Sequence, residues 1–143
     1  MVHKLSVKEV VEVWELFMKG ARTVFEMTEE DEKQLFNKCL TGISQLWAGY
    51  GDDEKVPIYM IVSTLSMLPA SGTKSLFLSH LYSVSEDSIT LEAWKDGFEV
   101  IVKFAKENAC TRLDCIASNP LVVDIFKSVS SNVIEHLYLI AKL

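Results

Sequence analysis

The chain has 143 residues, of which 49% are hydrophobic and 24% charged. This length and composition predict a single globular domain over residues 1–143 that buries its core without disulfides. The 14 basic and 20 acidic residues give a net charge of −6, and no segment collects a basic stripe, so we expect no nucleic-acid binding. No apolar run approaches the roughly 18 residues of a membrane span, so we expect a soluble protein without membrane association.

The three cysteines, Cys39, Cys110 and Cys115, are expected to be free thiols. Their number is odd, their segments look buried, and the charged N-terminal stretch MVHKLSVKEVVEVW is not a signal peptide. We therefore expect a cytoplasmic protein, located in the host cytoplasm or the virion if the chain is viral. Because the histidines do not cluster with the cysteines along the sequence, we interpret the cysteines as buried apolar side chains and expect no metal site.

Two helices are predicted in the first third of the chain, after a short strand at residues 2–5. The first helix begins with a capping box of Ser6 and Glu9, and apolar residues then recur at helical spacing. The second helix begins after Thr28, carries acidic residues in its first turn and ends near Gly42.

From Ser44 onward the period changes to that of strands. Residues 44–50 and 56–67 predict a hairpin around a turn at Gly51. Residues 75–84 are apolar on both faces, as the middle strand of a sheet covered on each side would be. The remaining elements are predicted in the order helix, strand, helix and strand, at residues 90–109, 110–118, 119–129 and 133–142.

This order of elements predicts an α/β (α+β) fold, in which a mixed sheet is covered by helices on both faces. Parallel neighbours in such a sheet are joined by right-handed crossovers. The apolar stripes predict that the core includes Trp14, Phe17, Leu35, Phe36, Leu40, Ile61, Leu78, Phe98, Ile101, Leu113 and Ile125.

The order also resembles the GNAT (Gcn5-related N-acetyltransferase) superfamily over nearly the whole chain. The most specific part is KFAKENACTRLDCIASNPLVVDIFKSVS, residues 103–130, which is similar to the third helix, fifth strand and fourth helix of that superfamily. Within the superfamily, the segments SGTKSLFLSHLYSV (residues 71–84) and AWKDGFEVIVKFAKENAC (residues 93–110) are most similar to short phage-encoded members. The resemblance implies a GNAT-like, mostly antiparallel central sheet with helices on both faces, in three layers.

Active GNAT members follow the central strand with a turn of the form Q/R-x-x-G-x-G/A, whose backbone N–H groups bind the coenzyme A pyrophosphate. The corresponding residues here are Ser85, Glu86, Asp87, Ser88, Ile89 and Thr90. This turn has no glycine and no arginine, and the charges of Glu86 and Asp87 would cap the helix dipole and repel a pyrophosphate. We therefore expect no bound cofactor, with acetyl-CoA held by a divergent turn as the alternative.

The residues that would act as acid and base also differ from those of active GNAT members. Many active members have a tyrosine in the last helix that protonates the leaving thiolate, and Phe126 stands in its place with no proton to give. His80 and Tyr82 share one face of the strand at 75–84, and either could act in catalysis if the protein is active. The alternative is a satisfied core histidine beside a packed tyrosine.

These departures favour a degenerate GNAT-fold protein that is not an enzyme and acts as a structural or protein-interaction module, for example in a phage virion. The alternative is an acyl-CoA-dependent N-acetyltransferase with a divergent cofactor turn. An interaction module would need a contact surface for a protein partner or a second copy. The candidates are Val13 and Leu16 on the first helix, and Leu137 and Leu139 on the final strand, whose outer edge could pair with another chain.

Overall fold

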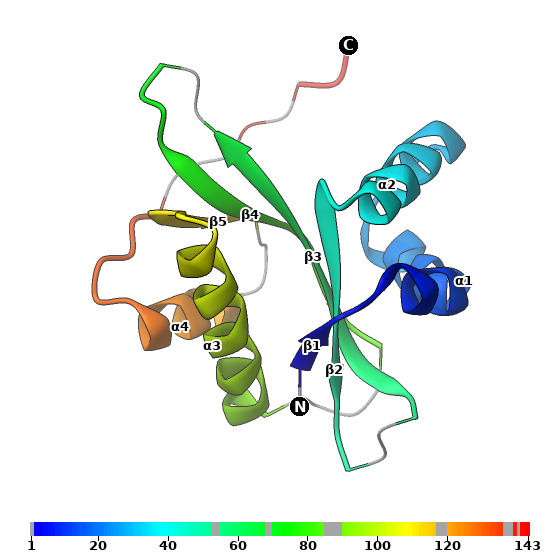
Figure 1. Ribbon diagram of the computed structural model, residues 1–143, viewed down its shortest axis with the longest axis horizontal. Helices are drawn as coiled ribbons and strands as arrows, with labels where there is room; N and C mark the ends of the chain where they lie inside the picture. The colour runs from blue at the N-terminus through cyan, green and yellow to red at the C-terminus, as the bar shows by residue number, and fades with distance from the viewer. Residues whose placement is uncertain are drawn as a thin grey trace.

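The computed structural model describes residues 2–52, 55–67, 70–84, 90–116, 120–135, 139 and 141–143. Within this part of the chain a sheet lies between two pairs of helices (Figure 1). Helices α1 (Val7–Val24) and α2 (Glu29–Thr41) cover one face, and α3 (Leu91–Glu107) and α4 (Pro120–Val129) cover the other. This three-layer α/β arrangement confirms the predicted fold class. No helix in the described ranges is long and apolar enough to cross a membrane.

Side-chain caps explain where α1 and α2 begin. The Ser6 hydroxyl accepts a hydrogen bond from the Glu9 N–H (3.3 Å), and the Glu9 carboxylate accepts one from the Ser6 N–H (2.8 Å). Thr28 and Asp31 form the same capping box before α2. Gly42 follows α2 with a φ of 81°, a left-handed conformation that glycine adopts without steric cost. The predicted boundaries of both helices are therefore confirmed.

The strands follow one another across the sheet in chain order. They are β1 (Val2–Lys4), β2 (Ser44–Tyr50), β3 (Pro57–Met67), β4 (Lys74–Ser83) and β5 (Arg112–Cys115). The first four are mutually antiparallel, and β5 is parallel to β4 because α3 carries the chain back across the sheet. The prediction that residues 75–84 form the middle strand is wrong, since β3 takes that place among the described strands. β4 is apolar on both faces because both helical layers reach it.

Each face of the sheet has its own hydrophobic core. Seven of the predicted core residues are buried: Phe17, Leu35, Ile61, Leu78, Phe98, Ile101 and Ile125. The others are partly buried and pack against the two cores: Trp14, Phe36, Leu40 and Leu113. The core predicted from apolar spacing is therefore confirmed.

The predicted final strand at 133–142 is wrong wherever the structure describes it. Residues 133–135, 139, 141 and 142 form neither helix nor strand, and Figure 1 shows this end of the chain leaving the sheet. An apolar, β-prone sequence becomes a strand only when a neighbouring strand satisfies its backbone hydrogen bonds, and these residues have no such neighbour among the described strands. Leu139 is 79% exposed, and Leu137 lies outside the described residues.

Val13 and Leu16 do not form the exposed apolar pair that was predicted on α1. Val13 is partly buried and packs against the core beneath α1 and α2, because α2 lies beside this face of α1. Leu16 is 37% exposed. Two such residues, one of them partly buried, do not make a contact surface.

Candidate functional site

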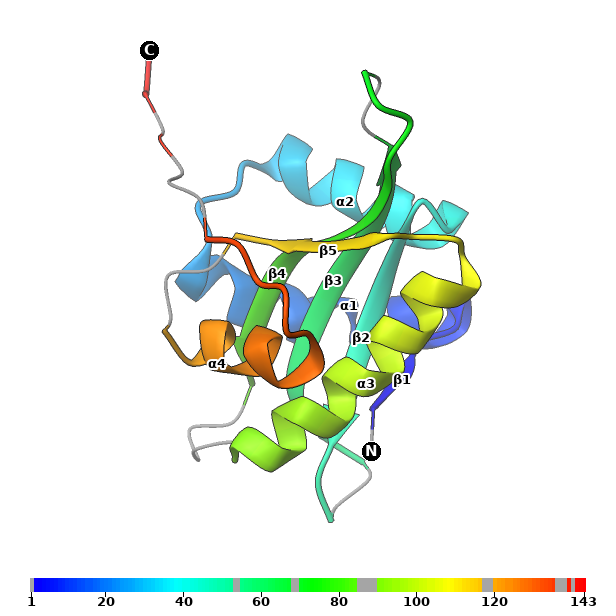
Figure 2. The ribbon, with the colours of Figure 1, turned by 90° about the vertical axis from the view of Figure 1, so that its left-hand side faces the viewer.

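The sheet opens between β4 and β5 partway along β4. The parallel pairing of the two strands ends at Leu78 and Cys115, whereas β4 continues to Ser83. Figure 2 shows β5 running off at an angle to β4, and beyond Leu78 no described strand pairs with this side of β4. Backbone groups of residues 79–82 on this side can therefore accept hydrogen bonds from, and donate them to, an extended ligand.

A β-bulge lies where this opening begins. Ser63 pairs with Leu78 and Val62 pairs with His80, so Ser79 is an extra residue that opposes no residue of β3. Side chains of a strand alternate between its two faces, and one extra residue reverses the alternation. As a result, Leu78 packs into the core beneath α3 and α4, whereas His80 faces α1.

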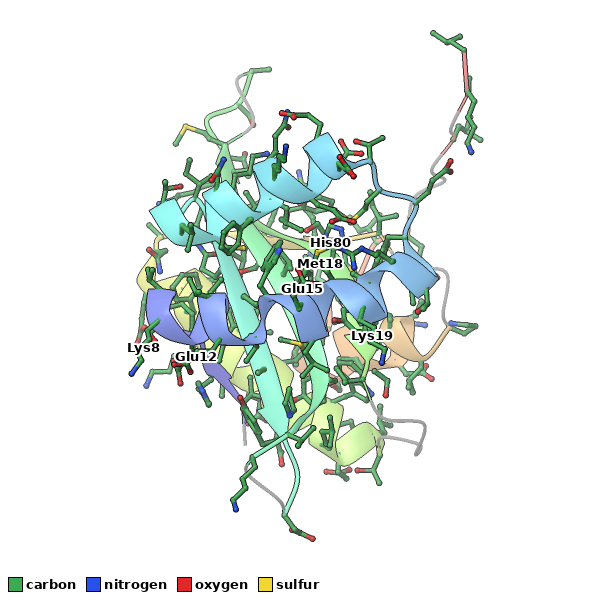
Figure 3. The ribbon with its side chains drawn as sticks, turned by 90° about the vertical axis from the view of Figure 1, so that its right-hand side faces the viewer. Lys8, Glu12, Glu15, Met18, Lys19 and His80 are labelled. Carbon is green, nitrogen blue, oxygen red and sulfur yellow. The ribbon has the colours of Figure 1, made fainter. Side chains whose placement is uncertain are left out.

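His80 is half-buried between the sheet and the helices α1 and α2 (Figure 3). Its ring centroid lies 4.5 Å from that of Phe25 and 6.4 Å from that of Phe17, and its Nδ1 lies 2.8 Å from Ser79 Oγ. Burial lowers the pKa of His80 from its ordinary value of 6.5, so the imidazole is neutral at pH 7. When Nδ1–H donates to Ser79 Oγ, the lone pair on Nε2 is available to accept a proton.

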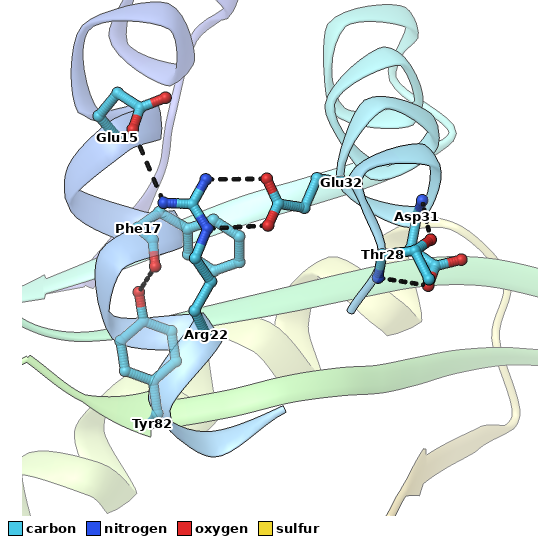
Figure 4. A network of polar contacts seen from close by, with 7 residues as sticks. All are labelled: Glu15, Phe17, Arg22, Thr28, Asp31, Glu32 and Tyr82. Atoms are coloured by element: carbon cyan, nitrogen blue, oxygen red, sulfur yellow. Dashed lines mark hydrogen bonds and ion pairs between the residues drawn. The ribbon is translucent and has the colours of Figure 1, made fainter. Parts of the chain in front are cut away.

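Tyr82 lies on the same face of β4 as His80, but its contacts are structural. Its O–H donates to the Phe17 carbonyl oxygen at 2.5 Å (Figure 4), and its ring is packed so closely against Gly20 that a Cβ atom there would overlap with it. Burial raises the pKa of Tyr82 well above its ordinary value, so the phenol keeps its proton. We interpret Tyr82 as the residue that anchors β4 to α1.

An ion-pair network fixes α1 against α2 one turn before Phe25. Nε and Nη2 of Arg22 each donate to the Glu32 carboxylate at 2.8 Å, and Arg22 Nη1 lies 3.9 Å from Glu15 Oε2 (Figure 4). The hydrogen bonds from Arg22 lower the pKa of Glu32. Two parallel hydrogen bonds restrict the relative orientation of the helices, which keeps the end of α1 beside His80.

No pattern in the sequence indicated three of these contributors, Arg22, Phe25 and Ser79. Each acts through a contact with a residue on another element or through a bulge, and none belongs to a motif of fixed spacing. The ring contact between Phe25 and His80, for example, depends on how α1 crosses β4. Only a tertiary structure brings these residues together.

The predicted cofactor turn leads into α3, and most of it lies outside the described residues: Ser85, Glu86, Asp87, Ser88 and Ile89. Thr90 is described, and its hydroxyl caps α3 by accepting a hydrogen bond from the Ala93 N–H at 3.2 Å. The Tyr59 O–H donates to the Ala93 carbonyl oxygen at 3.2 Å, and the Tyr59 ring lies 4.2 Å from that of Trp94. The first turn of α3 is therefore held firmly on β3.

The remaining candidates for catalysis lack a proton donor or a reactive thiolate. Phe126 lies 5.7 Å from Phe98, ring to ring, and packs into the core beneath α3 and α4, where it has no proton to donate. Cys39, Cys110 and Cys115 are free thiols, and burial raises the pKa of Cys39 and Cys115 to about 11. Those two thiols are therefore not nucleophilic thiolates at neutral pH.

A pocket of about 480 Å³ lies at the other end of α3, between β1, the C-terminal end of α2 and the start of β2. Its lining includes Gln45 and Asn108, but both amides are already used inside the protein. Gln45 Nε2 donates to the Gly42 carbonyl oxygen at 3.0 Å, and Asn108 Nδ2 donates to that of Phe104 at 2.9 Å. This pocket lies away from the opening between β4 and β5 and does not form part of the candidate site.

No protein-family model matches the sequence, and no curated protein matches it. Solved structures nevertheless share its fold over almost the whole chain. A probable acetyltransferase matches with a TM-score of 0.71 and 13% identity, over 99% of each chain. A ribosomal-protein-alanine N-acetyltransferase from Brucella melitensis biovar Abortus 2308 matches with a TM-score of 0.68 and 13% identity, also over 99% of each chain. A GNAT family acetyltransferase from Staphylococcus aureus matches with a TM-score of 0.70 and 13% identity, over 100% of this chain and 98% of that one.

The chain therefore has the fold of GNAT-family acetyltransferases, as its order of elements predicted. The main functional prediction, a non-catalytic structural or interaction module of a phage virion, is contradicted. The three structures described above are named as acetyltransferases, and they favour the alternative, an acyl-transfer enzyme; none of them supports a phage-encoded subtype. The prediction rested on the missing glycine turn and the missing tyrosine, and the names of these structures weigh against it. Likewise, nothing supports the expectation that no cofactor is bound.

Proposed function

We propose that this chain is an acyl-CoA-dependent N-acetyltransferase that uses acetyl-CoA to acetylate a primary amine. The observation that carries the proposal is the opening between β4 and β5, which begins at the bulge of β4 and lies next to a half-buried, neutral histidine. The fold that the chain shares with acetyltransferases supports the same function.

The free side of β4 suits the pantetheine arm of coenzyme A. The amide groups of pantetheine can hydrogen-bond to the backbone of residues 79–82 in the way an added strand would. The N-terminal end of α3, capped by Thr90, follows β4 in the chain and presents the positive end of a helix dipole. Glu86 and Asp87 precede this helix in the sequence and add negative charge, so we expect weaker pyrophosphate binding than a glycine turn would give. When bound, acetyl-CoA supplies the thioester carbonyl that an amine attacks.

His80 is the residue that accepts the proton of the attacking amine. Its Nε2 lone pair is available when Nδ1–H donates to Ser79 Oγ, and the rings of Phe17 and Phe25 restrict the orientation of the imidazole. Burial keeps the imidazole neutral at pH 7, which is the state that a base requires. The bulge at Ser79 is what turns this side chain toward α1 instead of toward α3.

The release of free thiol from acetyl-CoA tests the proposal when it is followed with a set of amines: a peptide α-amine, a lysine side chain, a polyamine and an amino sugar. We expect His80→Gln to lower kcat/KM by about 10²–10⁴-fold, the usual contribution of a general base. His3→Gln on β1 is the matched control and should leave the rate unchanged. Absence of both thiol release and acetyl-CoA binding would refute the function, and an unchanged rate in His80→Gln would refute the role of His80.

A further inference from the structure

The pocket between β1, the C-terminal end of α2 and the start of β2 has a largely apolar wall. The apolar part comes from Leu5, Cys39, Leu40, Leu65 and Phe104. Its volume of about 480 Å³ lies within the range of roughly 300–1,000 Å³ that is usual for small-molecule sites. This cavity is large enough to take a ligand of its own, apart from the opening between β4 and β5.

Hydrogen bonds and a ring contact inside the protein hold the walls of this pocket in place. Gln45 Nε2 donates to the Gly42 carbonyl oxygen at 3.0 Å, and Gln45 Oε1 accepts from Ser63 Oγ at 2.7 Å. Trp47 Nε1–H donates to the same Ser63 oxygen at 2.8 Å, and the Trp47 ring lies 5.2 Å from that of Phe104. Because these groups already satisfy one another, a ligand would meet a preformed cavity.

Lys4 gives the pocket a positive charge. Among the described residues that line it, Lys4 is the one charged side chain, although the chain as a whole has 20 acidic and 14 basic residues. Lys4 Nζ lies 5.2 Å from the centre of the Phe104 ring, so the ammonium group is directed over the apolar wall. Glu9 lies beside Ser6 at the rim, but its carboxylate is engaged by the Ser6 N–H at 2.8 Å. The charge of the lining therefore complements an anion.

We propose that this pocket binds a small amphipathic carboxylate, whose head group pairs with Lys4 and whose apolar part lies against Leu40, Leu65 and Phe104. A carboxylate at Lys4 Nζ forms a charge-assisted hydrogen bond, which is stronger than the contact of an exposed ammonium with an aromatic ring. A neutral ligand gains only the apolar contact, and an ammonium ligand is repelled by Lys4. The inference concerns a second site and does not rest on the proposed activity.

Octanoate is the probe, and its position can be located from ¹H–¹⁵N NMR spectra. We expect the largest chemical-shift changes at the amides of residues 4–7, 39–42 and 44–46 and of Phe104, which belong to the pocket wall. Residues 79–82 on the free side of β4 are the matched comparison, because an aliphatic chain could also enter that opening. Changes centred on residues 79–82, changes spread evenly over the protein, or no change at millimolar octanoate would each overturn the proposal.

Reversing the charge at position 4 tests the role of Lys4. In the wild-type protein, titrations followed at the wall amides should give octanoate at least about tenfold tighter binding than octylamine, the usual size of a charge-assisted contact. The net charge of −6 by itself would favour the amine. We expect Lys4→Glu to reverse this order with an unchanged circular dichroism spectrum.

Lys19→Glu is the matched control, because Lys19 is an exposed lysine of α1 that does not line the pocket. It changes the net charge by the same amount and should leave the order of the two ligands as in the wild-type protein. The proposal is wrong if the wild-type protein binds both ligands equally, if Lys4→Glu keeps the wild-type order, or if Lys19→Glu reverses that order.

Discussion

The surroundings of His80 determine the protonation state of its imidazole. The hydroxyl of Ser79 lies within hydrogen-bonding distance of one ring nitrogen, and two phenylalanine rings occupy the space beside the imidazole. These contacts make the histidine less basic than it would be in water, because burial disfavours the charged form. The residue is therefore a weak base that is already deprotonated at neutral pH.

This environment predicts the pH dependence of acyl transfer. With the amine saturating, we expect kcat to rise with pH and to level off above a midpoint that lies below 6.5, because only neutral His80 can accept a proton and burial lowers its pKa from that value. A pH–rate profile from pH 5 to pH 8 measures the midpoint. His80→Gln should abolish this limb of the profile, and a midpoint above 6.5 would contradict the assignment.

The same shift affects stability. The unfolded chain binds a proton at His80 more readily than the folded chain does, so the free energy of unfolding should rise with pH between pH 5 and pH 7. The contribution of His80 is complete above its unfolded pKa and is lost as the pH falls through the pKa of the folded state. Urea unfolding at pH 5 and at pH 7 measures this effect. The free energy of unfolding should change less between the two pH values in His80→Gln than in the wild-type protein.

At the scale of elements, the position of α1 on the sheet depends on a close contact between a glycine and an aromatic ring. Gly20 of α1 lies where a Cβ atom would overlap with the Tyr82 ring, and the Tyr82 O–H is bonded to the Phe17 carbonyl oxygen of the same helix. Glycine is unfavourable inside a helix by about 1 kcal/mol relative to alanine. Its presence here indicates that the approach of α1 to β4 matters more than helix propensity.

We therefore expect Gly20→Ala to destabilise the protein although alanine is the better helix former. Forcing an extra methyl group into a packed site typically costs about 1–3 kcal/mol, which exceeds the propensity gain of about 1 kcal/mol. Urea unfolding measures the difference. In a Tyr82→Leu background the overlap is relieved, so the same Gly20→Ala change should become neutral or stabilising; an equal loss in both backgrounds would show that the ring is not the cause.

Elements that depend on residues close together in the sequence could be predicted from it. Features that depend on contacts between distant parts of the chain could not. The capping box at Ser6, the N-cap at Thr28 and the helix end near Gly42 rest on residues a few positions apart, and all three are confirmed. The bulge at Ser79 leaves no such trace, because serine occurs equally well in a regular strand. The segment after α4 misled the prediction because its composition favours a strand, whereas a strand also needs a neighbour.

For the molecule as a whole, the layers decide how the candidate site is divided. The α1/α2 layer contributes the surroundings of His80, and the α3/α4 layer contributes the capped helix end that follows β4. His80 faces the first of these layers and the end of α3 belongs to the second, so the proposed reaction would use residues from both. This division agrees with a reaction that brings two substrates together.

Ligand binding to this opening should stabilise the whole fold. A ligand that binds only the folded chain adds about 2.7 kcal/mol at a concentration 100 times its dissociation constant. We expect acetyl-CoA at millimolar concentration to raise Tm by several degrees in differential scanning fluorimetry. Adenosine diphosphate is the matched control; it lacks the pantetheine arm that β4 would bind and should raise Tm less. Equal shifts with both ligands would contradict binding along β4.

The bulge of β4 also bears on how such a strand can change through evolution. Substitutions alter which side chain stands at a position, but only a change in length alters which layer a position belongs to. Removing Ser79 would place His80 directly after Leu78, so strict alternation would keep His80 and Tyr82 on the α1 face and Leu81 on the opposite face. At a regular position of β4, by contrast, removing one residue would move every later side chain to the other layer. The bulge therefore marks a position at which β4 can lose a residue while the side chains on either side of it keep their layers.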